Sequence, residues 1–308
     1  MRTGRASALT DTGRRRPHNE DTFVCDPPLF AVADGVGGAQ AGEIASRLAA
    51  ATLEERRPEA QGEETLAELL REANDRIYNR ALDEPAAAGM GTVVTALLVD
   101  EAAGTVSIGH VGDSRAYRLR DGRLDQLTPD HSLVGELVRA GRLSAEEAEQ
   151  HPHRSVITRA VGTEPNVDVH TDTHTVAPGD LYLICSDGLT DMVRDEQIAE
   201  LIAAAGNDPD TAAEGLVDAA NGAGGIDNIT VVLFEILDGE PPPAPDPVDE
   251  PDDDTMEQAL DSPAADPVAP LVPVQRHGAG SGGRWLALIA IVLTVAVAAL
   301  VVWWSLTK

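Results

Sequence analysis

Positively charged residues are scarce in this sequence. Its 308 residues include 23 Lys and Arg against 52 Asp and Glu, which gives a formal net charge of −29, and its one lysine is Lys308. A protein that binds a nucleic-acid backbone needs clustered Lys and Arg to contact the phosphates. The deficit therefore argues against a nucleic-acid partner, although an acidic composition by itself identifies no other partner.

Cysteine is also scarce, with Cys25 and Cys185 the only two. Both lie in apolar runs typical of β-strands, and their spacing matches no metal-ligand pattern. We therefore expect two buried free thiols and not a disulfide.

Lys and Arg are missing altogether from 238–275, where eleven acidic residues and ten of the twenty prolines occur. Such a segment buries too little apolar surface to offset the entropy of ordering it, and its charges repel one another. We predict an acidic, proline-rich disordered linker over 238–284, which separates a domain at 1–237 from the rest of the chain.

The run WLALIAIVLTVAVAALVVWW at 285–304 has only Thr294 as a polar residue. Its length matches the roughly 20 residues that a helix needs to cross a bilayer, and its terminal tryptophans suit the two interfaces. We predict a single-pass transmembrane helix over 285–306, followed by a short tail at 307–308.

Basic residues indicate the orientation of this predicted span. Arg276 and Arg284 precede it and Lys308 follows it, a weak bias that leaves the large N-terminal part on the cytoplasmic side. The start of the chain has Arg2 and Arg5 but no following apolar stretch, which argues against a secretory signal. We expect a protein of the inner (plasma) membrane with its N-terminal domain in the cytoplasm.

Residues 1–237 show short β-rich runs that outnumber the helical patterns. The runs cluster like hairpins, with a turn at Asp121-Gly122, which favours antiparallel sheets over a doubly wound parallel sheet. The predicted strands are 23–25, 29–33, 92–99, 105–110, 115–120, 167–176, 181–185 and 229–236, and the predicted helices are 42–56, 64–82, 132–139, 195–204 and 211–221.

Four aspartates share one setting, an apolar strand beside a tight turn. Asp34 follows FAVA, Asp113 follows IGHVG, Asp187 follows LYLICS, and Asp227 precedes NITVV. Aspartates at strand ends bring carboxylates together at one edge of a sheet, and hard divalent cations prefer such oxygen ligands. One Asp-Gly usually only forms a turn, but four such aspartates in apolar contexts predict a metal site.

An acidic pair, Glu20-Asp21, follows Arg16 in the run RRRPHNED. An arginine at the mouth of a carboxylate-rich site is suited to hold a phosphate through paired hydrogen bonds. A solvated basic turn would explain Arg14 to Arg16 more simply, so this motif predicts a phosphate site only in company with the aspartates.

Six motifs follow one another across nearly all of residues 5–237. They are Arg16 with Asn19-Glu20-Asp21, Ala33-Asp34-Gly35-Val36-Gly37-Gly38, Gly91-Thr92-Val93, His110-Val111-Gly112-Asp113-Ser114-Arg115, Ser186-Asp187-Gly188 and Asp227-Asn228-Ile229-Thr230. In order and spacing this set resembles the PP2C family of metal-dependent protein phosphatases. The stretches LTPDHSL at 127–133 and HPHRS at 151–155 are similar to the flap of bacterial members.

The resemblance implies an α+β fold, a sandwich of two antiparallel β-sheets flanked by α-helices, to which the predicted transmembrane helix is added. It implies hydrolysis of phosphoserine and phosphothreonine in proteins by a water activated at a binuclear Mn²⁺ or Mg²⁺ centre. A membrane anchor after an acidic linker is similar to the actinobacterial branch that counteracts transmembrane Ser/Thr kinases, so such kinases and their substrates are the expected partners.

Carried over by position, the resemblance makes Asp34 the carboxylate that bridges two metal ions. The carbonyl oxygen of Gly35 would bind one of these ions, while Asp187 and Asp227 would complete the other site.

The resemblance also assigns supporting roles. Glu20 and Asp21 would hold metal-bound waters, and Arg16 would receive the substrate phosphate. Asp113 would belong to a third, weaker metal site, with Ser155 as a candidate neighbour.

One position departs from the family. Many eukaryotic members read Asp-Gly-His-Gly-Gly, and the histidine is thought to protonate the leaving oxygen, whereas Val36 stands here and can transfer no proton. His131, His151 and His153 are candidate donors, and water is the alternative.

Two other functions compete with the phosphatase interpretation. A silent phosphoprotein-binding module would require lost metal ligands, yet every carboxylate that the resemblance places is present. A metal-dependent hydrolase of small phosphoesters or nucleotides could use the same site, and rates on a phosphothreonine peptide and a nucleotide monophosphate would separate the two.

Overall fold

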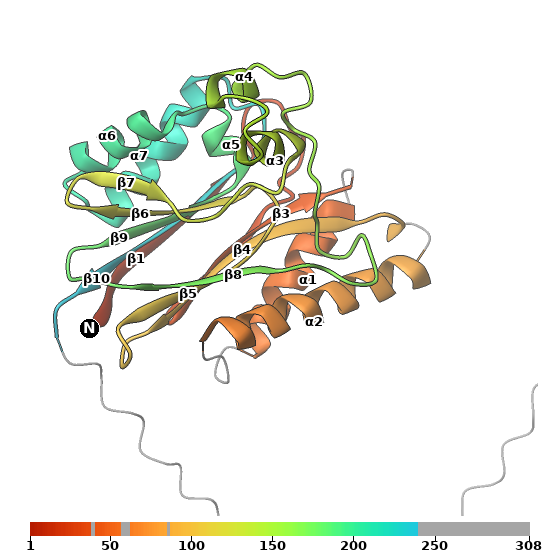
Figure 1. Ribbon diagram of the computed structural model, residues 1–308, viewed down its shortest axis with the longest axis horizontal. Helices are drawn as coiled ribbons and strands as arrows, with labels where there is room; N and C mark the ends of the chain where they lie inside the picture. Colours follow the sequence, from red (N-terminus) through yellow and green to blue (C-terminus); the bar gives the residue numbers. More distant parts are fainter. Residues whose placement is uncertain (38–40, 57–61, 85–86, 240–308) are drawn as a thin grey trace, which may run out of the picture. The chain divides into compact units, whose positions relative to one another are not determined.

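The computed structural model describes residues 1–37, 41–56, 62–84 and 87–239. In this part of the chain, ten strands form two five-stranded antiparallel sheets, and helices cover the outer face of each sheet (Figure 1). The antiparallel α+β sandwich expected from the sequence is therefore confirmed.

The first sheet has the strand order β1-β10-β9-β6-β7. Its strands are β1 (Arg2–Asp11), β10 (Ile229–Leu237), β9 (Leu181–Cys185), β6 (Arg115–Arg120) and β7 (Arg123–Gln126).

The second sheet has the order β2-β3-β4-β5-β8. It contains β2 (Thr22–Asp26), β3 (Leu29–Val36), β4 (Gly91–Asp100), β5 (Thr105–Val111) and β8 (His170–Thr175).

Four long helices pack against the sheets. The helices α1 (Ala41–Glu55) and α2 (Gly62–Asp83) contact the second sheet, while α7 (Pro209–Gly222) lies on β1 and β10 and carries α6 (Asp195–Ala204) beside it.

Three short helices complete the described fold. The helices α3 (Leu133–Arg139) and α4 (Ala145–Glu149) belong to the flap, which we define as residues 130–160, and α5 (Asp187–Thr190) directly follows β9.

The strand β9 shows how a short apolar run joins two cores. Leu181, Leu183 and Cys185 pack toward α6 and α7, while Tyr182 and Ile184 point into the space between the sheets. Successive side chains of a strand face opposite sides, so a strand covered on both faces is apolar throughout.

Aromatic rings link the two sheets at the centre of the sandwich. Phe30 of β3 stacks on Phe234 of β10 with ring centroids 4.0 Å apart, and the Tyr182 ring of β9 is also stacked with Phe234, at 5.1 Å. A separate apolar core lies between the second sheet and α1 and α2. Both cysteines are free thiols, as predicted, but only Cys185 is buried; Cys25 is half-buried, so the prediction that both are buried is wrong for Cys25.

The structure differs from the predicted elements in five main places. The strands β1 and β7 and the helices α4 and α5 were not predicted, and β8 begins at His170 instead of at position 167. The sequence RTGRASALTD of β1 has small and polar residues and no strong alternation, and it becomes a strand because it pairs with β10 along its length.

The predicted linker beyond Gly239, the predicted transmembrane helix over 285–306 and the tail at 307–308 lie outside the described residues. Among the helices of the described ranges, none has both the length and the apolar character needed to cross a bilayer.

Candidate metal centre

The antiparallel registers bring the four aspartates to one end of the sandwich. Asp34 lies near the end of β3 and pairs with Val93 of β4, and Asp113 lies in the turn between β5 and β6. Asp187 directly follows β9, and Asp227 lies two residues before β10. Because β9 pairs with both β6 and β10, the strand ends beside Asp113, Asp187 and Asp227 are neighbours in the first sheet. Asp34 is on the second sheet, whose strand β3 contacts β9 and β10, and the charges of the other three aspartates act on it.

Burial and mutual repulsion act on these carboxyl groups. The pKa of Asp34 is raised well above its usual range, first by burial and then by the charges of Asp21 and Asp187. The pKa of Asp187 is likewise raised well above its usual range by burial and by the charges of Asp113 and Asp227. Groups that influence one another in this way are close together, and gathering them is unfavourable without a compensating cation.

Asp21, whose charge acts on Asp34, is held by two hydroxyl groups. Thr230 Oγ1 donates to Asp21 Oδ2 at 2.7 Å and Ser186 Oγ donates to the same atom at 2.9 Å. Its other oxygen, Oδ1, is buried and lacks a hydrogen-bond partner in the described part of the chain. Burial raises the pKa of Asp21 to about 6, although the two hydroxyl groups oppose that rise. An unpartnered buried carboxylate oxygen is suited to coordinate a cation or to accept a hydrogen bond from a cation-bound water.

Two glycines let the backbone approach this site closely. A side chain at Gly35 would bring its Cβ into the backbone of Gly42, at the start of α1. A side chain at Gly42 would in turn collide with Glu20 Oε2. The Glu20 carboxylate therefore lies against α1, and burial raises the pKa of Glu20.

The predicted phosphate-binding arginine contacts a predicted metal ligand. Arg16 Nη2 donates to Asp227 Oδ2 at 2.6 Å, and this hydrogen bond raises the pKa of Arg16. Half of the Arg16 side chain is exposed, so its guanidinium lies at the open side of the carboxylate group.

Asn228 fixes the loop that carries Arg16 and Glu20. Its Oδ1 accepts from the Glu20 backbone N–H at 2.8 Å, and its Nδ2 donates to the carbonyl oxygens of Thr12 and His18, each at 2.9 Å. The sequence motif contained Asn228, Ser186 and Thr230, but no structural role was predicted for them. The sequence signal that could have revealed these roles is that all three polar residues lie within three positions of Asp187 or Asp227.

In the described residues, no three His, Cys, Asp or Glu side chains already form a closed ligand set. The carboxylates repel one another, and Arg16 draws Asp227 toward itself. The donor set, the orphaned Asp21 oxygen and the two glycines nevertheless fit hard divalent cations.

The candidate proton donors lie in the flap, where His131 is buried at 3% exposure. Its Nδ1 accepts from the Gly112 backbone N–H at 3.1 Å, and its ring centroid is 4.7 Å from that of His110. Burial lowers the pKa of His131 to about 4.

The remaining flap candidates lie farther out. His153 and Ser155 are exposed, and His151 is half-buried, with its ring centroid 5.7 Å from that of His153. The ion pair between Arg154 and Asp191, at 3.5 Å, connects this part of the flap to the end of α5.

A sandwich of two five-stranded antiparallel sheets with partly buried carboxylates gathered at one end defines a class of α+β proteins suited to hold hard divalent cations. Within that class, the chain belongs to the protein phosphatase 2C family, whose family profile matches residues 18–214. The family resemblance of the sequence motifs is confirmed.

Named relatives support the same assignment. Serine/threonine protein phosphatase PstP of Mycobacterium tuberculosis is 41% identical over 239 residues, which cover 76% of this chain and 45% of that protein. The serine/threonine phosphatase stp of Listeria monocytogenes is 39% identical over 242 residues, which cover 75% of this chain and 95% of that protein. The chain thus spans about half the length of the mycobacterial relative.

A solved structure has the same fold. The catalytic domain of serine threonine protein phosphatase PstP in complex with two manganese ions matches with a TM-score of 0.68 and 38% identity. The match covers 76% of this chain and 98% of that one.

Proposed function

We propose that this chain hydrolyses phosphoserine and phosphothreonine in proteins with two Mn²⁺ or Mg²⁺ ions at the candidate metal centre. The observation that carries the proposal is the set of partly buried aspartates from three strand ends and one turn, with the half-exposed Arg16 bound to one of them. The named relatives are serine/threonine phosphatases, and one of them was solved with two manganese ions.

The residues of this chain supply the ligands and the positioning. Asp34 is proposed to bridge the two ions, with Gly35 on one of them and Asp187 and Asp227 on the other. The ions, when bound, lower the pKa of a water molecule and neutralise charge on the phosphoryl group.

The polar residues around these ligands are proposed to orient water and phosphate. Asp21 is fixed by Thr230 and Ser186, so its unpartnered oxygen is held in one place for a metal-bound water. Arg16 already contacts Asp227 with one nitrogen, and its planar fork leaves other N–H groups for the phosphate oxygens.

The proton for the leaving oxygen does not come from His131 in this proposal. Its pKa of about 4 keeps the imidazole neutral near pH 7, and its Nδ1 already accepts from Gly112. A water molecule, or His151 or His153 of the flap, remains for this step. If water serves, single alanine substitutions of His151 and His153 leave the pH–rate profile on a phosphopeptide unchanged.

The test is Mn²⁺-dependent hydrolysis of phosphoserine, phosphothreonine and phosphotyrosine peptides and of a nucleotide monophosphate. We expect the phosphoserine and phosphothreonine peptides to be preferred, with no turnover in excess EDTA. The control for the site is the Asp34→Asn variant, which we expect to turn over the peptide at less than about a tenth of the wild-type rate. Faster hydrolysis of the nucleotide would favour the small-phosphoester alternative, and EDTA-resistant turnover would contradict the metal centre.

The full chain is proposed to act at the inner face of the plasma membrane on phosphorylated kinases and their substrates. The support is the apolar run at 285–304 behind the acidic segment at 238–284, which would tether the domain near other membrane proteins and raise their effective concentration. A chain cut after Leu237 should retain peptide turnover and lose rate on a membrane-embedded phosphorylated kinase. Equal rates on the embedded kinase with and without the tether would contradict this part.

A further inference from the structure

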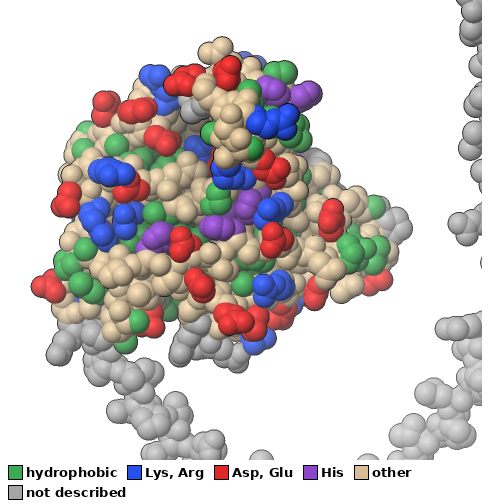
Figure 2. Space-filling model, in the orientation of Figure 1, with side chains coloured by type: hydrophobic (Ala, Val, Ile, Leu, Met, Phe, Trp, Pro, Cys, Tyr) green, Lys and Arg blue, Asp and Glu red, His purple; other side chains and the backbone are tan. Residues whose placement is uncertain are grey.

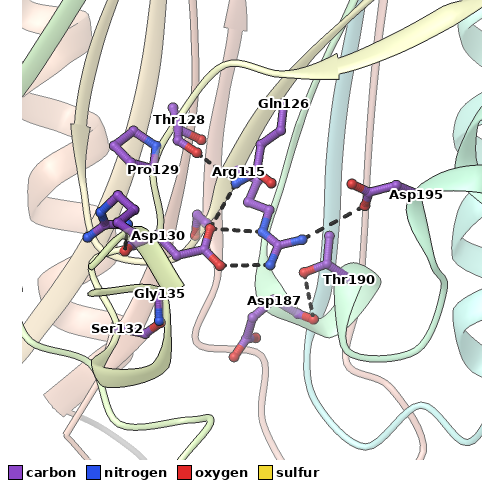
Figure 3. A network of polar contacts seen from close by, with 12 residues as sticks. Arg115, Gln126, Thr128, Pro129, Asp130, Ser132, Gly135, Asp187, Thr190 and Asp195 are labelled. Carbon is purple, nitrogen blue, oxygen red and sulfur yellow. Dashed lines mark hydrogen bonds and ion pairs between the residues drawn. The ribbon is translucent and has the colours of Figure 1, made fainter. Parts of the chain in front are cut away.

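Arg115 begins β6, two residues after Asp113, and its guanidinium joins three segments of the chain (Figure 3). Its Nε and Nη2 donate to Asp130 Oδ1 and Oδ2 at 2.9 and 2.7 Å. Its Nη1 donates to Tyr117 Oη at 3.0 Å and lies 3.8 Å from Asp195 Oδ1. Tyr117 Oη in turn donates to Asp195 at 2.9 Å.

Asp130 is the first residue of the flap, and other contacts hold it in the same place. Gln126 Nε2 donates to Asp130 Oδ1 at 3.0 Å, and Arg139 Nη1 of α3 donates to the Asp130 carbonyl oxygen at 2.8 Å. The contact to Arg139 connects the start of the flap with its first helix.

The next flap residue contacts the other side of Asp113. The His131 backbone N–H donates to the Gly112 carbonyl oxygen at 2.7 Å, and the Gly112 N–H donates to His131 Nδ1 at 3.1 Å. Two consecutive flap residues therefore bind the residues on both sides of Asp113. We call Gly112, Arg115, Asp130 and His131 the Asp113 bracket.

The bracket has little freedom to adjust. Gly112 has φ +118°, and a Cβ at this position would collide with the side chain of Val93. The Arg115 and Asp130 side chains are 26% and 18% exposed, so their ion pair is largely desolvated. A desolvated ion pair adds little net stability compared with apolar residues of similar size. Its two parallel hydrogen bonds nevertheless fix the orientation of the Asp130 carboxylate relative to the Arg115 guanidinium.

We propose that Arg115 is a positioning residue for the phosphatase reaction. By binding Asp130 with two nitrogens, it fixes the entry of the flap against the turn that carries Asp113, and through Tyr117 and Asp195 it fixes both against the segment that follows Asp187. Arg115 touches neither substrate nor reacting atoms in this role, which rests on the proposed function.

Arg120 offers a matched control on the same strand. Its Nε and Nη2 donate to Asp180 Oδ1 and Oδ2 at 2.6 and 2.5 Å, and Asp180 is fully buried. The pair has the same chemistry but lies at the other end of β6, away from the Asp113 bracket. A purely structural role for Arg115 predicts that Arg115→Met and Arg120→Met behave alike.

The experiment uses the full-length chain in detergent with Arg115→Met, Asp130→Asn, the double variant and Arg120→Met. The first readout is the rate of tryptic cleavage in the flap with saturating Mn²⁺, identified by fragment mass at Arg139, Arg142, Arg154 and Arg159. The second is kcat/KM on a phosphothreonine peptide well below each variant's Tm. We expect Arg115→Met and Asp130→Asn to speed flap cleavage and to lower kcat/KM by about ten- to a hundredfold, the scale of a misplaced site.

The double variant should be no worse than Arg115→Met alone, because Arg115→Met already removes the contact with Asp130. Arg120→Met should lower Tm, because it leaves the buried Asp180 carboxylate without its partner, yet it should leave flap cleavage and kcat/KM within about twofold of wild type. A folded Arg115→Met chain that matches Arg120→Met in both readouts overturns the proposal. If Arg115→Met does not fold, Arg115→Lys, which keeps the charge without the fork, is judged by the same two readouts. A wild-type chain without peptide turnover would contradict the proposed function, while the cleavage readout would still test the bracket.

Discussion

Two kinds of desolvated ionisable residue lie at or near the candidate metal centre, and protonation changes their charge in opposite ways. Asp34 and Asp187 are carboxyl groups whose charged form is disfavoured by burial and by their neighbours. His110 is an imidazole whose charged form is disfavoured by full burial. Neutralising an aspartate by mutation relieves repulsion, whereas protonating the histidine creates an uncompensated charge.

Replacing the proposed bridging ligand should separate stability from activity. We expect Asp34→Asn to reduce Mn²⁺-dependent turnover to less than about a tenth of wild type. In excess EDTA the same variant should unfold at a higher temperature than wild type, because one buried charge is removed from the group. Thermal unfolding with EDTA and with Mn²⁺ measures this, and the Mn²⁺-induced rise in Tm should shrink in the variant. A variant less stable than wild type in EDTA would contradict the repulsion argument.

His110 should make the fold sensitive to acid. Burial lowers its pKa to about 3, while Thr95 Oγ1 lies 2.9 Å from its Nδ1 and the Pro129 carbonyl oxygen lies 3.1 Å from its Nε2. Below the ordinary imidazole pKa of 6.5, the unfolded chain therefore binds a proton at His110 but the folded chain does not. The stability that the neutral ring contributes is present above pH 6.5 and is lost as the pH falls, by up to about 1.4 kcal/mol per pH unit.

Urea unfolding of wild type and His110→Gln at several pH values from about 7 to about 4 isolates this effect. The difference in unfolding free energy between the two proteins should narrow as the pH falls, because only wild type carries the titrating ring. The same comparison with the half-buried His174, as His174→Gln, serves as the control. A constant difference across the range would show that His110 titrates normally in the folded chain.

At the scale of elements, the residue pattern predicted individual strands and the turns beside them, but it did not predict which distant segments contact one another. The run LYLIC of β9 is apolar because both faces are covered, so it was predictable, as were the aspartates at strand ends. The strand β1 acquires its structure from pairing with β10, more than 200 residues away. The Arg16–Asp227 and Arg115–Asp130 pairs depend on the register of strands and loops, which local sequence does not encode.

Asn228 shows how one residue before β10 controls a distant loop. We expect Asn228→Ala to lower stability by about 1–3 kcal/mol, because it leaves partly buried backbone groups at Thr12, His18 and Glu20 without partners. Since this loop carries Arg16, the peptide KM should rise more than kcat falls. Steady-state kinetics and urea unfolding measure the two effects.

Asn74 provides the comparison for Asn228. It is buried in α2, donates to the Glu164 carbonyl oxygen at 3.1 Å and accepts from the Gly162 N–H at 2.7 Å. Asn74→Ala should lose similar stability while leaving KM near the wild-type value. An equal change of KM in both variants would contradict a specific role for the loop that carries Arg16.

At the scale of the molecule, acidic charge dominates the domain. Residues 1–237 contain 20 basic and 41 acidic residues. On the face drawn in Figure 2, arginine and acidic side chains are interspersed, so no single basic surface is visible there to attract a phosphorylated protein. Long-range repulsion between the domain and an acidic substrate is therefore expected, and salt screens such repulsion.

Substrate charge should consequently set the salt dependence of the reaction. For a phosphothreonine peptide flanked by glutamates, kcat/KM should rise severalfold between about 0.01 and 0.15 M ionic strength, where the Debye length falls from about 30 to 8 Å. A peptide flanked by arginines should show the reverse trend at equal Mn²⁺ concentration. Identical salt dependence for the two peptides would exclude long-range steering.

The thiol of Cys185 gives the apolar strand β9 a further consequence. Cys185 lies two residues before Asp187, is fully buried, and has a pKa raised to about 12 by that burial. Its reactive thiolate form is nearly absent while the strand stays closed. The rate at which Cys185 is alkylated therefore reports how often β9, the strand before Asp187, opens to solvent. The alkylation rate of the half-buried Cys25 of β2 reports the opening of the opposite sheet in the same way.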